Sequence, residues 1–212
     1  MKSILLGLLF CVPFLLHAQR KPLDYKMAVS FNPSLLIGSD YTVMLGAEYR
    51  VKEKIGLLLD AGYIFHSSYF EANKIKGASG FNLRPAVRWY GRKGKEFLQL
   101  QLFYKHVDYN IYDWLGKNCV NEVPAYEQLQ NFIYRKKAVT LNFIVGEMYR
   151  LSDDLYIEIY AGLGTKFKSQ GPTEPNSCYR NEGGDVGFNM YNEKSVTPNV
   201  PMGFKLVYLL KR

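Results

Sequence analysis

The chain has 212 residues, which suits a single domain, and a formal net charge of +8. Aromatic residues make up 15%, with 17 Tyr and 13 Phe against 2 Trp, and Tyr and Phe favour β-strands. A net positive charge can indicate a protein that binds nucleic acid. No basic stripe interleaved with aromatic residues faces outward in the strand pattern, so we expect no nucleic-acid partner.

The first eighteen residues predict a secretory signal peptide. Lys2 precedes an apolar run from Ile4 to Leu16, and Ala18 closes the segment before Gln19. A charged start, an apolar centre and a small residue at the cleavage edge are the parts of such a signal. At roughly 13 residues the run is shorter than the about 20 that a transmembrane helix needs. We therefore expect residues 1–18 to be removed and residues 19–212 to form one domain.

After Gln19 the chain repeats stretches of about ten residues with period-two alternation, which predicts β-strands. In Ile55–Phe65 one parity is apolar, while the other is mixed and carries glycines and Asp60. About eight such strands predict an all-β protein, an antiparallel up-and-down transmembrane β-barrel. In chain order the predicted strands are Lys26–Asn32, Tyr41–Val51, Ile55–Phe65, Phe81–Tyr90, Leu98–Val107, Ala138–Leu151, Leu155–Phe167 and Val200–Leu210.

The links between these strands alternate in length. Short links are predicted at 51–54, 91–96 and 151–154, and longer ones at 32–40, 66–79, 108–136 and 168–197. Short periplasmic turns that alternate with long extracellular loops are typical of a transmembrane barrel. We expect the loops 66–79, 108–136 and 168–197 to face the outside and to be the surface for an extracellular or surface partner.

The polarity of the two strand faces predicts the outer membrane. The charged parity is rich in glycine, which suits a narrow lumen, and the apolar parity would contact outer-membrane lipid. Aromatic residues gather near strand ends, as Trp89 and Phe81 do, like the girdles at a membrane interface. Glu147 is a misfit on the lipid-facing parity, and a bulge near Gly146 or an interfacial position are both open explanations.

Charges of both signs fall on the predicted interior face. They are Glu48, Arg50, Asp60, Arg84, Arg88, Lys105, Arg150, Glu158, Lys166 and Lys205. An eight-stranded barrel is just wide enough for side chains to fill it, so the favoured interpretation is a salt-bridged plug. A selectivity lining for a small pore is the alternative, and the plug predicts that conductance is absent or very small.

Two other functions remain as alternatives. His66, Ser67, Ser68 and His106 lie near predicted outer strand ends, where a base beside a hydroxyl could serve a lipid-modifying enzyme. A soluble periplasmic lipocalin-like carrier would need the apolar parity to point inward. We predict no catalytic, cofactor-binding or metal-binding residues.

Cys119 and Cys178 lie in the two longest predicted loops. An even pair in an oxidising compartment favours a disulfide. We expect this bond to tie the two loops together, with a pair of free thiols as the alternative.

Two segments carry a resemblance to a known family. They are FNLRPAVRWY at Phe81–Tyr90 and LNFIVGEMYRLSDDLYIEIYAGLGTKFK at Leu141–Lys168. They resemble the uncharacterised small outer-membrane β-barrel proteins of Bacteroidota, a domain of unknown function, in which an L-R-P-x-x-R-[YW]-Y strand and an L-S-D hairpin recur. The resemblance implies an outer-membrane barrel, inserted by the barrel-assembly machinery, with no established activity and no catalytic residues to carry over.

Overall fold

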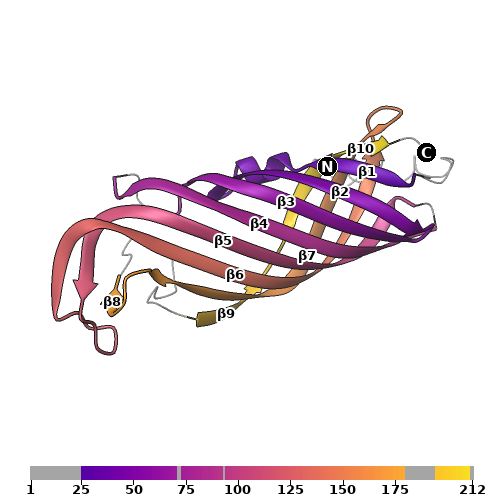
Figure 1. Ribbon diagram of the computed structural model, residues 1–212. Coiled ribbons are helices and arrows are strands. Elements are labelled where there is room, and N and C mark those ends of the chain that lie inside the picture. Colours follow the sequence, from indigo (N-terminus) through magenta and orange to yellow (C-terminus); the bar gives the residue numbers. More distant parts are fainter. Residues whose placement is uncertain (1–24, 71–72, 93, 180–193, 211–212) are drawn as a thin grey trace, which may run out of the picture.

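The computed structural model describes residues 25–70, 73–92, 94–179 and 194–210, so the predicted signal peptide lies outside the described residues. Within them, one antiparallel sheet closes into a ring of eight strands (Figure 1). The strands follow chain order from β1 to β7, and β10 closes the ring by pairing with both β7 and β1. The expected all-β, up-and-down barrel of about eight strands is confirmed.

Most strands lie close to their predicted positions. The strands are β1 Met27–Phe31, β2 Asp40–Lys52, β3 Ile55–Ser67, β4 Ile75–Tyr90, β5 Glu96–Lys117, β6 Tyr126–Arg150, β7 Leu155–Pro172, β8 Ser177–Cys178, β9 Lys194–Asn199 and β10 Met202–Leu210. A 3₁₀ helix, η1, spans Pro33–Leu36 between β1 and β2. β9 pairs with the part of β7 beyond β10, and β8 pairs with β5.

One end of the barrel carries short turns. Lys52 ends β2 and Ile55 begins β3, and only residues 151–154 separate β6 from β7. Gly94, in the turn between β4 and β5, has a φ of 68°, a conformation that glycine adopts without a steric penalty. We call this the short-turn end of the barrel.

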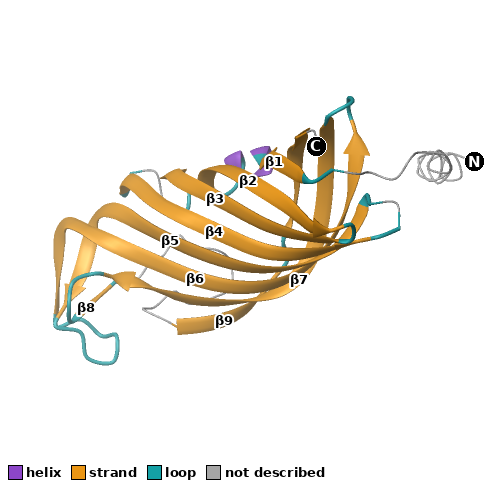
Figure 2. Cartoon of the chain, turned by 45° about the vertical axis from the view of Figure 1, so that its right-hand side comes forward, coloured by secondary structure: helices purple, strands orange, loops and turns teal. Residues whose placement is uncertain are grey.

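The predicted loop 108–136 is wrong. β5 and β6 continue through it as a paired hairpin of 22 and 25 residues, from Glu96 opposite Glu147 to Lys117 opposite Tyr126. The hairpin extends past the ends of the neighbouring strands in two views (Figures 1 and 2). Strand residues also replace parts of the other two predicted loops, since β4 begins at residue 75, β7 ends at residue 172 and β9 begins at residue 194.

A change of polarity along β5 explains why the sequence pattern predicts a loop at 108–136. Up to Tyr104 the outward side chains are mostly apolar, and the inward ones include the buried Gln99 and Gln101. Beyond that point the outward positions hold His106, Asp108 and Asn110 before the exposed Tyr112 and Trp114, whereas most inward positions hold fully buried apolar side chains. The period of two persists, but the apolar side moves from outside to inside.

The outer wall of the barrel is an apolar belt. No helix among the described residues is long and apolar enough to cross a bilayer. The belt consists of outward side chains that are 37% to 69% exposed: Val43, Leu45, Leu57, Leu59, Leu83, Leu98, Leu102, Val139, Leu141, Phe143, Val145, Ile159, Leu163 and Phe204. Exposed Tyr49, Trp89 and Tyr208 lie toward the short-turn end, and exposed Phe65 and Phe81 toward the other.

Two apolar clusters fill the interior on either side of a polar middle. The cluster at the short-turn end contains Tyr25, Ala28, Tyr90, Phe97, Ile144, Met148, Tyr156, Tyr160, Val207 and Leu209. The cluster inside the hairpin end contains Ile64, Phe70, Ala78, Val107, Tyr109, Ile111, Leu115, Phe132, Tyr134 and Tyr179. The charged residues that concern function lie between these clusters.

Candidate functional site

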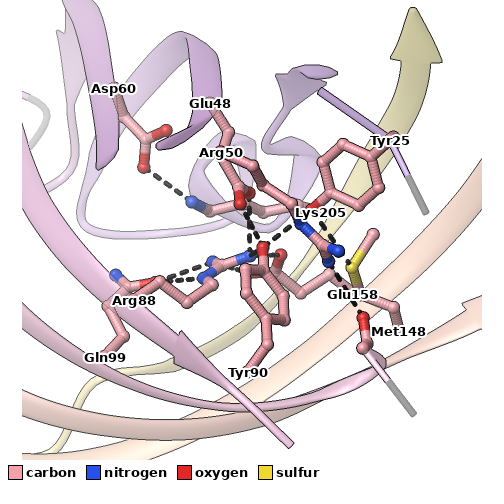
Figure 3. Close-up of polar contacts among 11 residues, drawn as sticks. Tyr25, Glu48, Arg50, Asp60, Arg88, Tyr90, Gln99, Met148, Glu158 and Lys205 are labelled. Carbon is pink, nitrogen blue, oxygen red and sulfur yellow. Dashed lines mark hydrogen bonds and ion pairs between the residues drawn. The ribbon is translucent and has the colours of Figure 1, made fainter. Parts of the chain in front are cut away.

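Arg88 is the centre of a buried ion network (Figure 3). Its Nη1 and Nη2 donate to the two carboxylate oxygens of Glu158 at 2.8 and 3.0 Å, and Nη1 also lies 3.3 Å from Glu48. Nε and Nη2 donate to Gln99 at 3.0 and 2.6 Å. The guanidinium lies 3.7 Å from the centre of the Phe97 ring. One cation thus connects four strands, β2, β4, β5 and β7, and its donors are fully used.

Small residues and aromatic rings complete this layer. Tyr90 donates a hydrogen bond to Glu48, and a methyl group on Gly56 would lie 2.5 Å from the Glu48 carboxylate. Arg50 lies between two rings, 3.9 Å from the centre of Tyr25 and 3.8 Å from that of Tyr90. The glycine makes room for the carboxylate, and the two tyrosine rings, which meet edge to face, pack in the lumen at the short-turn end.

A second ion pair lies beside this network. Lys205 Nζ of β10 donates to Asp60 Oδ2 of β3 at 2.6 Å, and both side chains are less than 5% exposed. A methyl group on Gly46 would lie 2.0 Å from Asp60 Oδ1, so a larger residue there would displace the Asp60 carboxylate. The pair reaches across the barrel, because β3 and β10 are not neighbours in the sheet.

A third polar group lies toward the hairpin end. Asp40 pairs with Lys105 and accepts hydrogen bonds from Ser67 Oγ at 2.6 Å and from Tyr109 Oη at 3.0 Å. Nearby, Lys136 Nζ lies 3.7 Å from the centre of the Tyr69 ring. Lys136 precedes the apolar belt of β6, which begins at Val139. Burial, and next to it repulsion from Lys105, lowers the pKa of Lys136 to about 7.

The tip of the hairpin is crosslinked to the segment after β7. The expected disulfide is confirmed: Cys119 and Cys178 are bonded, with their Cα atoms 6.0 Å apart. Tyr179 packs against Phe132, with ring centres 5.0 Å apart, and donates to Asp113 at 2.8 Å. The bond therefore holds the β8 segment against β5, with which it pairs.

The outward face of the hairpin carries a surface ion pair at the level where the polarity changes. Arg135 Nε and Nη2 each lie 2.7 Å from an oxygen of Asp108. Hydrogen bonds from this guanidinium hold the pKa of Asp108 below its ordinary value.

The predicted interior charges fall into three groups. Glu48, Arg50, Asp60, Arg88, Glu158 and Lys205 are buried in the lumen, whereas Arg84, Lys105 and Lys166 face it and stay partly accessible to water. The prediction that Arg150 lies in the interior is wrong, because its side chain is 47% exposed and pairs with Asp153 in the turn. It keeps the inward parity of Met148, but it ends β6 and lies beyond the packed interior.

Glu147 lies near the short-turn end, where it is partly accessible and accepts a hydrogen bond from Tyr149 at 2.9 Å. The pairing of β6 with β5 and with β7 is continuous there, so no bulge occurs at Gly146. Its position at the strand end, together with the tyrosine, accommodates the carboxylate.

The predicted histidine and serine set is not assembled into a pair of base and nucleophile. Ser67 is 1% exposed and its hydroxyl contacts Asp40 and the carbonyl of Ser39. His66 packs at a tilt against Tyr41, with ring centres 5.2 Å apart, and His106 lies 3.5 Å from Asp108. In the described part of the chain, no three His, Cys, Asp or Glu side chains form a cluster that could hold a metal ion.

The sequence prediction missed Gln99, Asp40 and Lys136. Lys136 could have been found by continuing the alternation of β6 backwards from Ala138, because the two share one face. Comparison with family models, with curated proteins and with solved structures found no match to this chain.

Proposed function

We propose that this chain is a small outer-membrane β-barrel with a plugged interior and a structural or surface-binding role. The change of polarity along β5 carries the proposal. Outward side chains are mostly apolar as far as Tyr104 and polar from His106 to Asn110, while most inward side chains change in the opposite sense. A strand in water along its whole length keeps its polar face outside, whereas a strand that leaves lipid changes at the boundary.

A substitution in the apolar belt distinguishes lipid from water around the barrel. Leu59 is 52% exposed on β3. In a bilayer, Leu59→Arg should lower the free energy of unfolding by up to about 2–4 kcal/mol, depending on the depth of the residue. In water, a substitution at an exposed position changes this free energy by no more than about 0.5 kcal/mol. Val120→Arg, at the exposed hairpin tip, is the matched control and should be neutral in both environments. Equal stability of the two variants in lipid vesicles would contradict the proposal.

Localisation is tested by separating membranes and running the protein on gels with and without boiling. The proposal predicts recovery with the outer membrane and a mobility that changes on heating, after secretion through residues 1–18 and insertion by the barrel-assembly machinery. Recovery in the soluble periplasmic fraction would instead favour the lipocalin-like carrier.

The interior supports a closed barrel rather than a pore. The Arg88 network and the pair of Lys205 with Asp60 fill the middle, and the apolar cluster that contains Tyr25 and Tyr90 fills one end. We expect no stable current in planar bilayers, and porin-like currents would overturn this part of the proposal.

The β5–β6 hairpin is the part of the proposed barrel that stands outside the membrane. Its disulfide and its aromatic packing make it a rigid surface that an extracellular partner could bind without a large ordering cost. The proposal is non-enzymatic, and an unchanged lipid A mass spectrum after deletion and overexpression is the expected result. Altered lipid A would favour the lipid-modifying alternative.

A further inference from the structure

Outward side chains of neighbouring strands form rows across the outer wall, because the pairing of the strands sets them at one height. The register of β4, β5, β6, β7 and β9 defines two such rows where the polarity changes. The row nearer the short-turn end is apolar and contains Leu83, Tyr104, Val139, Phe167 and Val196. The row beyond it contains Phe81, His106, Lys137, Ser169 and Lys194. We call them the apolar row and the boundary row.

Two lysines of the boundary row flank a small residue. Ser169 of β7 pairs with Lys137 of β6 on one side and with Lys194 of β9 on the other. All three residues are exposed on the outer wall. Neighbouring strands lie about 4.8 Å apart, so the two lysines are attached to the wall roughly 10 Å apart. Their long, flexible side chains can therefore reach a single anion over Ser169, and the serine hydroxyl can donate a hydrogen bond to the same anion.

The charges of these two lysines remain available for a ligand. Lys137 and Lys194 form no ion pair within the described part of the chain. Asp108 lies on β5 two residues beyond His106, but Arg135 already binds both of its carboxylate oxygens at 2.7 Å. Lys137 attracts Asp108 through space, with less effect than Arg135. Two unpaired ammonium groups beside one neutralised carboxylate favour an anionic ligand.

The apolar row indicates which kind of anion fits this place. Nearer the short-turn end, the three strands that carry the lysines and the serine present exposed apolar side chains. These are Val139, Phe167 and Val196, which are 40%, 52% and 63% exposed. A free phosphate ion would contact the lysines and leave this apolar surface uncovered. An anionic lipid covers both, because its phosphate lies at the boundary of the bilayer and its acyl chains lie in the apolar interior.

We propose that Lys137, Ser169 and Lys194 bind the phosphate of an anionic membrane lipid, whose acyl chains lie against the apolar row. The inference rests on the membrane barrel proposed above and names one class of lipid that this barrel binds. Ammonium groups form strong, charge-assisted hydrogen bonds with phosphate oxygens. A lipid whose headgroup also carries a cation, such as phosphatidylcholine, binds less tightly, because that cation is repelled by the two lysines.

Native mass spectrometry of the folded full-length barrel, titrated with phosphatidylglycerol or with phosphatidylcholine of the same acyl chains, tests the proposal. We expect the first phosphatidylglycerol to bind about tenfold more tightly than phosphatidylcholine. Lys137→Gln or Lys194→Gln should weaken phosphatidylglycerol binding about fivefold, and the double variant should remove the preference. Lys137→Arg keeps the charge and should retain most of the affinity. The matched control is Lys76→Gln, an exposed lysine over the Tyr112 ring farther from the belt, which should change affinity by less than about twofold.

Ser169→Leu separates a defined site from diffuse attraction by a basic surface. The substitution leaves every charge in place but fills the space between the two lysines. Affinity for phosphatidylglycerol should therefore fall several-fold, while phosphatidylcholine binding stays the same. Unchanged affinity for phosphatidylglycerol in Ser169→Leu would show that the lysines attract anionic lipids without a site and would count against the proposal.

Failure of the lipid site can be told apart from failure of the membrane barrel. Insertion is measured first in vesicles of phosphatidylcholine alone, with gels run with and without boiling for every variant. A wild-type protein that does not insert contradicts the membrane barrel and the lipid site with it. An inserted barrel that binds both lipids equally, or loses as much affinity from Lys76→Gln as from Lys137→Gln, overturns the lipid site and leaves the membrane barrel in place.

Discussion

Replacing Arg88 with methionine tests how strongly the ion network stabilises the barrel. The side chain is 1% exposed and contacts two carboxylates, so Arg88→Met leaves Glu48 and Glu158 buried without this cation. Breaking a buried ion pair from one side costs about 3–5 kcal/mol, because the remaining charge stays desolvated. The loss of the stacking on Phe97 adds to this cost.

Two matched variants isolate the charge effect. Arg150→Met removes an arginine of the same size from a pair that is 47% and 89% exposed, so we expect a loss of at most about 1 kcal/mol. Glu48→Gln and Glu158→Gln in the Arg88→Met background remove the remaining charges together. Replacing a whole buried ion group by neutral residues costs little, so this triple variant should recover most of the lost stability.

The assay is guanidinium titration of the folded barrel in lipid vesicles, followed by tryptophan fluorescence and by gel mobility without boiling. Arg88→Met should shift the midpoint well below that of Arg150→Met. Equal midpoints for these two variants would refute the reasoning, as would a triple variant less stable than Arg88→Met alone.

Three further predictions concern single features of the barrel. Gly46→Ala should lower the free energy of unfolding by about 1–3 kcal/mol, because the added methyl group overlaps the buried Asp60 carboxylate. In Gly77→Ala the added methyl group meets nothing within 4 Å, so this control should leave stability unchanged in the same titration. Replacing Cys119 and Cys178 removes a crosslink between residues 59 apart in sequence and should lower the free energy of unfolding by at most about 4 kcal/mol. Proteolysis of the hairpin should become faster, while the heat-dependent gel shift persists. Lys136 has a pKa of about 7 in the folded barrel, below its ordinary value, so it releases its proton on folding. The free energy of unfolding should therefore rise between pH 7 and pH 10. Unfolding midpoints measured across this range should show the rise in the wild-type protein and a smaller one in Lys136→Met.

The alternation of side chains along each strand was enough to predict most of the strands of the barrel wall and their inward faces. Each strand carries its own period of two, which assigns the inward face of a residue without knowledge of the neighbouring strand. Glu48, Arg88 and Glu158 were placed in the lumen on this basis, and the structure buries all three. The sequence also predicted the disulfide, because Cys119 and Cys178 are the even pair left after the predicted signal peptide, in an oxidising compartment.

The sequence by itself therefore determined the strand alternation, the approximate strand number and the inward parity of the ten predicted interior charges. Only the tertiary structure decided where the packed interior ends, as Arg150 and the long β5–β6 hairpin show. It also decided which distant residues meet, such as Arg88 of β4 and Glu158 of β7. The physical reason is register: pairing between strands sets the height of each residue along the barrel, and no single strand contains that information.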